Sequence, residues 1–373
     1  MKKAVLIPDS FKGTLSSAAI CGIMRERIAA RFPGCEVCSV PVADGGEGSV
    51  DAFLTALGGE KVCLPVAGPY HESMQAFYGL IDGGRTAVVE MAACAGLPLV
   101  EGRRDPGRTT TYGVGELILD AAARGVKKIV VGLGGSCTND GGCGAAAAVG
   151  VRFLDKSGRA FVPVGGTLRD IERIDLAGKS ALLRGVEIVT MCDIDNPMAG
   201  ENGAAYIFAP QKGADPEMVR MLDEGLRHLG EVIRRDLGRD LTEVPGGGAA
   251  GAMGVGMMAF FDSSLQMGIE TVLDTVDFDA LISDADMIFT GEGKIDSQSL
   301  RGKVVIGVAR RAKKQGKPVI AVVGGSDLDM EGAYKEGVKA IFTINRLPQD
   351  LSVSRFQSGE NLAFVMDNIL RLL

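Results

Sequence analysis

Six acidic side chains and several cations follow short apolar runs, and this combination of residue types could support chemistry. The acids are Asp9, Asp44, Asp193, Asp195, Glu292 and Asp296, and the accompanying cations are Lys12, Lys294 and either Arg301 or Lys303. Transfer of a phosphoryl group needs cations that neutralise its charge, a carboxylate that holds magnesium and another that orients or deprotonates the attacking hydroxyl. The residues match that need, although any one acid alone could instead be a turn or cap residue.

A glycine-rich stretch, GLGGSCTNDGGCG at residues 132–144, is the second candidate for chemistry. It follows the strand predicted for residues 128–131 and precedes a run of small residues. Such a turn leaves backbone N–H groups at the start of a helix, where they attract phosphate or carboxylate. Its polar side chains are Ser136, Thr138, Asn139 and Asp140. The sequence therefore indicates an anion-binding loop, and the alternative is a tight strand-to-helix turn.

Composition limits the class of protein. The 373 residues are enough for two domains, and 46% of them are hydrophobic. A net charge of -7 argues against a nucleic-acid or anionic-membrane partner. The longest uncharged apolar run, at residues 246–261, is too short to span a membrane. Eight cysteines without a secretory signal fit a reducing compartment, so we expect a soluble cytoplasmic protein.

Strand and helix patterns alternate at both ends of the chain, which predicts a parallel α/β domain. Loops that follow parallel strands meet at one edge of the sheet, where ligands bind. Residues 61–97 instead show short strands typical of an antiparallel meander. We therefore expect a Rossmann- or flavodoxin-like domain formed by residues 1–62 and 285–373. Residues 63–284 would form an inserted mixed α/β domain, with the active site in the cleft between the two.

Several common functional patterns are absent or weak. No Gly-Lys pair has the upstream glycine of a Walker A sequence, so a phosphotransferase here would not belong to the P-loop class. Residues 246–251 match GxGxxG, but no convincing strand precedes them, which disfavours a nicotinamide dehydrogenase. His71 and His228 lack the partners of a catalytic triad or a histidine metal site.

Seven motifs, in order along nearly the whole chain, resemble those of the bacterial type-1 glycerate kinase family. They are PDSFKGTLS (8–16), PVADGGEG (41–48), TTTYGVGELI (109–118), GLGGSCTNDGG (132–142), CDIDNP (192–197), FAPQKGA (208–214) and TGEGKIDSQSLRGK (290–303). The resemblance implies ATP-dependent phosphorylation of D-glycerate, usually at the 2-hydroxyl, with magnesium. It also implies two α/β domains, one inserted in the other.

Other functions stay open at this point. The same motifs could serve a kinase for another small hydroxy acid or sugar acid, or a glycerate kinase that gives 3-phosphoglycerate. A module that binds a sugar acid without catalysis is a further alternative, which the presence of all the strand-end acids disfavours.

The roles of single residues are hypotheses beyond the resemblance. Asp193 is expected to be the base or the orienting carboxylate, because partial desolvation at the end of an apolar strand could raise its pKa. Asp296 and Glu292 are expected to hold Mg²⁺, and Lys294 to clamp phosphate. Lys12 and Ser10 would bind the glycerate carboxylate or the transferring phosphate. The other candidates for substrate or phosphate binding are Asp9, Asp44, Gly45, Gly46, Gly134, Gly135, Ser136, Thr138, Asn139, Asp140 and Asn196.

Overall fold

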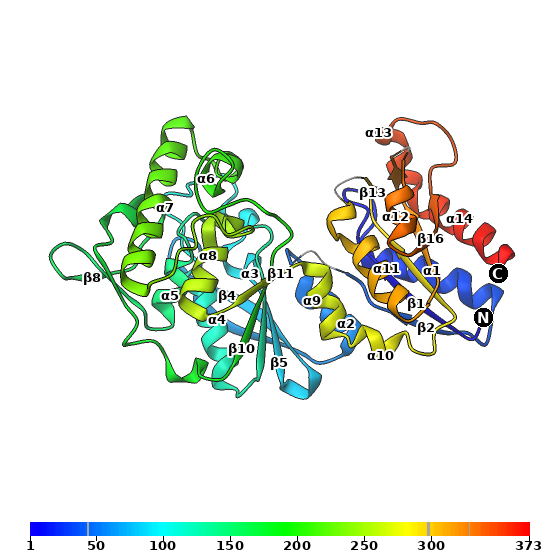
Figure 1. Cartoon of the computed structure of the whole chain (residues 1–373), viewed down its shortest axis with the longest axis horizontal. Coiled ribbons are helices and arrows are strands. Elements are labelled where there is room, and N and C mark those ends of the chain that lie inside the picture. The colour runs from blue at the N-terminus through cyan, green and yellow to red at the C-terminus, as the bar shows by residue number, and fades with distance from the viewer. Residues whose placement is uncertain (43–44, 297–298, 328) are drawn as a thin grey trace. The chain divides into compact units, whose positions relative to one another are not determined.

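The computed structural model describes residues 1–42, 45–296, 299–327 and 329–373, which form two compact units (Figure 1). Unit 1 comprises Met1–Ala43, Thr55–Leu57 and Met267–Leu373, and unit 2 comprises Asp44–Leu54 and Gly58–Gln266. The chain thus leaves unit 1 earlier than the expected crossing at residue 62 and returns before residue 285.

Packing explains both shifts of the boundary. Leu54, near the end of helix α2 (Ser49–Leu57), lies against Gly59 and Gly79 of unit 2. At the return, Ile269 of helix α9 lies against Gly307 of helix α11, so α9 belongs to unit 1. Arg311 of α11 adds an ion pair to Asp274 of α9, with 2.6 Å between nitrogen and oxygen.

Unit 1 contains a five-stranded parallel sheet in the order β16-β14-β12-β1-β2. Its strands are β1 (Lys3–Pro8), β2 (Glu36–Ser39), β12 (Met287–Gly291), β14 (Val319–Val323) and β16 (Val338–Thr343), and β13 (Lys294–Ile295) pairs separately with β15 (Gly325–Ser326). Its helices are α1 (Ser17–Arg31), α9 (Gly268–Thr275), α10 (Phe278–Leu281), α11 (Val304–Lys314), α12 (Glu331–Lys335), α13 (Leu351–Ser354) and α14 (Ser358–Leu372). The parallel domain built from both chain ends is confirmed.

Local signals set the elements of unit 1. Ser16 caps α1, and its hydroxyl accepts a hydrogen bond from the Ala19 N–H at 3.2 Å. Helices α1 and α14, from the two ends of the chain, pack side by side over a shared apolar core (Figure 1). In the sheet, Pro8 pairs with Gly291, so the residues that follow β1 and β12 emerge at the same edge.

Unit 2 contains a six-stranded mixed sheet in the order β11-β10-β6-β5-β4-β3. The strands are β3 (Glu60–Ala67), β4 (Ser73–Ile81), β5 (Thr86–Glu90), β6 (Lys128–Gly132), β10 (Glu187–Met191) and β11 (Ser264–Gln266). The pairs β3–β4 and β4–β5 are antiparallel and the other pairs are parallel, so the expected meander and mixed architecture are both found. A small sheet holds β7 (Arg152–Leu154), β8 (Ala160–Phe161) and β9 (Arg173–Asp175).

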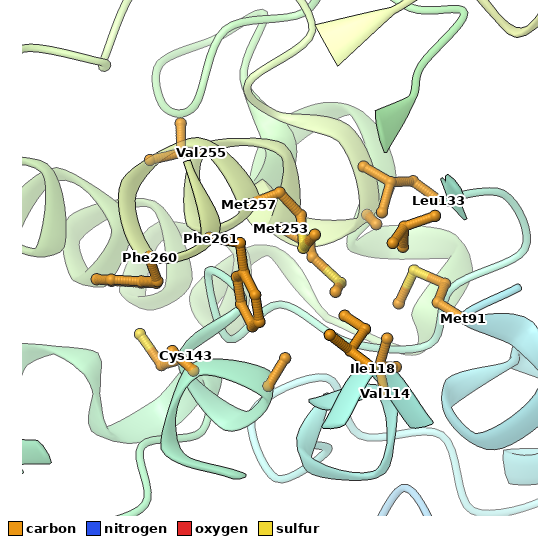
Figure 2. Close-up of a cluster of buried hydrophobic side chains, with 14 of the residues drawn as sticks. Met91, Val114, Ile118, Leu133, Cys143, Met253, Val255, Met257, Phe260 and Phe261 are labelled. Carbon is orange, nitrogen blue, oxygen red and sulfur yellow. The ribbon is translucent and has the colours of Figure 1, made fainter. Parts of the chain in front are cut away.

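The helices of unit 2 are α2, α3 (Ala92–Ala95), α4 (Tyr112–Ala123), α5 (Cys143–Ala148), α6 (Ala204–Phe208), α7 (Pro216–Leu237) and α8 (Ala249–Phe261). Helix α7 has an Asp215 cap at its start and Gly238 in the left-handed conformation at its end. Helix α8 is buried along its whole length. Figure 2 shows its side chains in one apolar cluster with those of α4 and the start of α5. In the part of the chain that the structure describes, no helix is long and apolar enough to cross a membrane.

Candidate functional site

Two acids of unit 1 lie next to each other at the end of the parallel sheet. Asp9 directly follows β1 and Glu292 directly follows β12, and these two strands are paired neighbours. The Asp9 N–H donates to the Gly291 carbonyl oxygen at 2.8 Å, which continues the ladder to this edge. The negative charge of Asp9 raises the pKa of Glu292, as expected for neighbouring carboxyl groups. The strand register therefore brings these two predicted site residues together.

Glu292 has an unusual environment for a carboxyl group. It is 4% exposed, and its Oε1 has no hydrogen-bond partner among the described residues. Burial raises the pKa of Glu292 to about 7, and the charges of Asp9 and Asp296 act in the same direction. A hydrogen bond from Ser299 and the positive charge of Lys303 oppose the rise. Such a buried, incompletely satisfied acid is typical of a functional site.

Of the other predicted residues of unit 1, Asp296 and Ser10 interact close to Glu292 and Asp9, whereas Lys294 has a different partner. Asp296 and Ser299 exchange two hydrogen bonds at 3.1 and 3.2 Å, and the charge of Asp296 acts on Glu292. The Ser10 N–H donates to Asp9 Oδ1 at 2.6 Å. Lys294, by contrast, is exposed and pairs with Asp327, with 2.8 Å between Nζ and Oδ1. To bind phosphate, Lys294 would have to give up its ion pair with Asp327.

Lys12 lies in the loop that joins β1 to α1. A Cβ atom at Gly293 would lie 3.4 Å from the Lys12 backbone nitrogen, so this loop touches the one that follows β12. The Lys12 residue itself is exposed. Its backbone is thus placed beside the Asp9 and Glu292 loops, as the sequence predicted.

The acids of unit 1 can be compared with what magnesium requires. Mg²⁺ prefers oxygen ligands and commonly takes one or two carboxylates, with phosphate and water oxygens completing the shell. Glu292 supplies a buried carboxylate oxygen that has no hydrogen-bond partner among the described residues, and Asp296 is its acidic neighbour. In the described residues, no group of three or more His, Cys, Asp or Glu side chains could hold a metal. The donor set therefore fits a magnesium ion that arrives with phosphate oxygens, and not one held by protein alone.

In unit 2 a buried lysine, which the sequence did not single out as a site residue, contacts the glycine-rich loop. Lys212 is 2% exposed, and its Nζ donates to Ser136 Oγ at 2.8 Å and to the Thr138 carbonyl oxygen at 2.6 Å. Burial lowers the pKa of Lys212 to about 8, which the charges of Cys137 and Asp140 oppose. The signal for this residue was its place in FAPQKGA, a lysine among small and apolar residues.

Two adjacent residues of the same loop carry buried polar atoms without partners. The Thr138 hydroxyl and both polar atoms of the Asn139 side chain have no hydrogen-bond partner among the described residues. Both residues are fully buried. Buried polar groups are nearly always hydrogen-bonded, so these three atoms lack bonds that such groups normally make. The loop thus gathers Ser136, Thr138 and Asn139 with Lys212.

Asp140 has a different place from the one predicted. It is fully buried, and it accepts hydrogen bonds from Thr111 N–H (2.8 Å), Thr111 Oγ1 (2.9 Å), Gly142 N–H (3.1 Å) and Gly144 N–H (3.2 Å). Its burial raises the pKa of the carboxyl, and the four donors oppose that rise. The carboxylate joins the starts of α4 and α5, so we assign it to capping and not to ligand binding.

The glycines of the loop serve a close approach between two backbones. The Gly134 N–H donates to the Gly45 carbonyl oxygen at 3.0 Å. A Cβ atom at Gly132 would lie 2.3 Å from that oxygen, and one at Gly134 would lie 2.5 Å from Gly46 Cα. Gly135 has φ of +73°, a conformation that favours glycine. Gly45 and Gly46 therefore lie against the predicted anion-binding loop, whereas Asp44 is outside the described residues.

The loop after β10 holds the remaining candidates. Asp193 and Asp195 are exposed. The burial expected for Asp193 is therefore not found. Asn196 Nδ2 donates to the Asn202 carbonyl oxygen at 2.8 Å, which fixes the side chain within its own loop. Strands β6 and β10 are paired, with Gly132 opposite Met191, so both loops start at the same edge of the sheet.

Glycines of the GxGxxG pattern at residues 246–251 pack against both of these loops, the one after β6 and the one after β10. A Cβ atom at Gly248 would lie 2.2 Å from the Pro197 carbonyl oxygen, and one at Gly251 would lie 2.2 Å from the Thr138 carbonyl oxygen. The Gly141 N–H donates to the Gly251 carbonyl oxygen at 3.0 Å. These glycines thus allow contact with both site loops, which accounts for their spacing without a dinucleotide.

The chain is similar to known proteins over nearly its whole length. The profile described as "Glycerate kinase family" matches residues 4–373. The chain is 43% identical to a glycerate kinase of Bacillus cereus, over 98% of this chain and 97% of the relative. It is 43% identical to the glycerate 2-kinase of Escherichia coli K12, over 92% of this chain and 90% of the relative. A crystal structure described as "putative glycerate kinase 2 from Salmonella typhimurium LT2" has a TM-score of 0.87 and 40% identity, and the match covers 100% of this chain and 98% of that one.

The match extends over the acids that follow β1 and β12 and over the glycine-rich loop with its buried lysine. The chain belongs to the glycerate kinase family.

Proposed function

We propose that this protein transfers the terminal phosphoryl group of ATP to the 2-hydroxyl of D-glycerate, giving 2-phosphoglycerate, with magnesium. The observation that carries the proposal is membership of the glycerate kinase family over nearly the whole chain, together with a relative named glycerate 2-kinase. We place the enzyme in the cytoplasm, a choice supported by eight cysteines that are all free.

Unit 1 is proposed to hold the magnesium ion and the phosphates. Asp296 and Glu292 would hold Mg²⁺, which would neutralise charge on the transferring phosphoryl group. Ser10, Lys12 and Asp9 lie in the loop beside these acids, which supports a role in phosphate or substrate binding. Lys294 would join them after release from Asp327, since an exposed ion pair is weakly held.

Unit 2 is proposed to bind glycerate through the glycine-rich loop. Ser136, Thr138 and Asn139 are its polar side chains, and Lys212 adds a positive charge. Asp193 remains our candidate for the carboxylate that orients or deprotonates the attacking hydroxyl. Its exposure removes the support that desolvation would have given, so its place after β10 is what supports the role.

A substrate panel tests the proposal. Release of ADP would be measured with D-glycerate, L-glycerate, D-lactate and D-gluconate, each with ATP and magnesium. We expect D-glycerate to give the highest kcat/KM. Turnover of another acid in its place would show that the motifs report the reaction and not the substrate. Absence of turnover with every acid would contradict the kinase assignment.

A further inference from the structure

Lys212 is a buried cation whose charge is incompletely matched. Two of the three N–H donors of its ammonium group are used, by Ser136 Oγ and by the Thr138 carbonyl oxygen. Both acceptors are neutral. The nearby carboxylate of Asp140 already accepts four hydrogen bonds from other groups. A buried charge normally has a paired counter-charge, and neither printed acceptor of Lys212 among the described residues is charged, so an anionic ligand would complete its pairing.

The same loop has donors and acceptors left over beside this cation. Thr138, whose carbonyl oxygen binds Lys212, also carries a buried hydroxyl without a partner among the described residues. The next residue, Asn139, carries an amide whose nitrogen and oxygen are both without partners there. Leaving such atoms unsatisfied costs stability, so a bound group such as a ligand or a water molecule is expected to complete their hydrogen bonds.

We propose that Lys212, Asn139 and Thr138 form the receptor for the hydroxy-acid substrate, with the ammonium group binding its carboxylate and the amide and hydroxyl binding its alcohol groups. The inference rests on the proposed function for the identity of the acid. It assigns Lys212 a role in substrate affinity, in addition to its contacts with the loop.

The chemistry of the receptor favours a hydroxy acid over a nucleotide phosphate. Whichever way its amide is turned, Asn139 presents an NH₂ group that donates and an oxygen that accepts. The phosphate oxygens of a nucleotide only accept hydrogen bonds, so they would leave the amide oxygen unsatisfied. Glycerate offers a carboxylate for Lys212 and hydroxyl donors for the amide oxygen. A ligand with a carboxylate and hydroxyl groups can therefore satisfy Lys212, Asn139 and Thr138 together.

The first test uses the KM values of the two substrates. Lys212→Met should raise the KM for D-glycerate by roughly 10- to 100-fold, the loss expected for a hydrogen bond to a charged group, and leave the KM for ATP unchanged. Lys156→Met, in the exposed turn between β7 and β8, is the matched control and should leave both KM values unchanged. A rise confined to the KM for ATP would overturn the assignment in favour of a phosphate site.

The second test distinguishes a ligand-binding role from a structural one. Asn139→Leu keeps the size of the side chain and removes two buried polar atoms that have no described partner. The ligand-free variant should therefore melt at or above the temperature of the wild type, while its KM for D-glycerate rises. The increase in melting temperature that D-glycerate gives the wild type should disappear. A variant that melts lower and keeps its KM for glycerate would overturn the proposal.

Failure of the receptor and failure of the proposed function give different results. If the wild type turns over D-glycerate and both variants keep its KM, the receptor is wrong and the function stands. If the wild type turns over no glycerate, the melting experiment without nucleotide decides the inference. Stabilisation of the wild type but not of Asn139→Leu by glycerate or lactate would support the receptor, and absence of stabilisation by either acid would overturn it.

Discussion

At the scale of the residue, Glu292 carries a carboxyl group that the fold makes costly to ionise. Its pKa rises from the ordinary 4.5 to about 7, chiefly through burial. Between these two pH values the folded chain keeps a proton that the unfolded chain has released. The free energy of unfolding should therefore fall as pH rises through this range, by about 3 kcal/mol at about 1.4 kcal/mol per pH unit.

Replacement of Glu292 by Gln should remove this slope and stabilise the protein near neutral pH. Urea unfolding at about pH 5 and about pH 7.5, in buffer with a chelator, measures the difference, because a bound cation would itself lower the pKa. Glu331→Gln, at an exposed position of unit 1, is the control and should keep the slope of the wild type. Equal slopes for the wild type and Glu292→Gln would show that Glu292 titrates normally.

Asp193 gives the residue-scale prediction for catalysis. If it orients or deprotonates the attacking hydroxyl, Asp193→Asn should lower kcat by about 100-fold or more, the usual contribution of a general base. The KM values should change little, because the amide keeps the shape of the carboxyl group. Asp195→Asn, the exposed acid two residues later, should lower kcat far less. A near-normal kcat for Asp193→Asn would transfer the base role to another acid.

Residue types at strand ends could be predicted, but their environments could not. Asp9 and Glu292 were expected at one edge, and the strand register places them there. Lys212 was missed because its place among small and apolar residues in FAPQKGA does not show which loop it packs against. The environment of Asp140 could not be predicted because its four donors come from the starts of two helices far apart in the chain, which only the tertiary fold brings together.

At the scale of the element, α8 begins with three consecutive residues in the left-handed conformation. Ala250 has φ of 55° and ψ of 42°, and Gly251 and Ala252 follow with φ of 68° and 65°. This conformation costs an alanine roughly 1–2 kcal/mol. The turn places the Gly251 backbone against Thr138 in the site loop. The strained turn therefore contacts the loop that carries the proposed receptor.

Ala250→Gly should relieve this strain. The gain is opposed by the greater freedom of glycine in the unfolded chain, about 0.5–1 kcal/mol, so we expect a change in unfolding free energy between zero and about 1 kcal/mol of stabilisation. Ala259→Gly, in the right-handed part of the same helix, should instead destabilise by about 1 kcal/mol or more. Chemical denaturation measures both. Equal losses for the two variants would mean that position 250 is unstrained.

Some elements follow directly from local signals in the sequence. Helix α7 carries a regular apolar stripe, with a proline at its first position and a glycine after its last. Helix α8 was not predicted, since its glycines oppose helix formation and its uniform hydrophobicity shows no period. Its complete burial in unit 2 overrides both, as Figure 2 illustrates for its packing with α4.

At the scale of the whole molecule, the parallel unit built from both chain ends and the mixed inserted unit follow from the order of strands and helices. The residues at which the chain passes from one unit to the other do not follow from that order. The choice between units for α9 depends on contacts such as Ile269 with Gly307, which join segments distant in the sequence. Boundaries of this kind are set by packing and not by local pattern.

The most direct test of the proposed reaction is its product, observed by phosphorus NMR with D-glycerate, ATP and magnesium. We expect a new phosphate-ester signal split into a doublet by the single proton on C2 of 2-phosphoglycerate. A triplet from the CH₂ group of 3-phosphoglycerate would keep the kinase and contradict the position of transfer. Consumption of ATP with release of inorganic phosphate alone, and no ester signal, would contradict phosphorylation of glycerate.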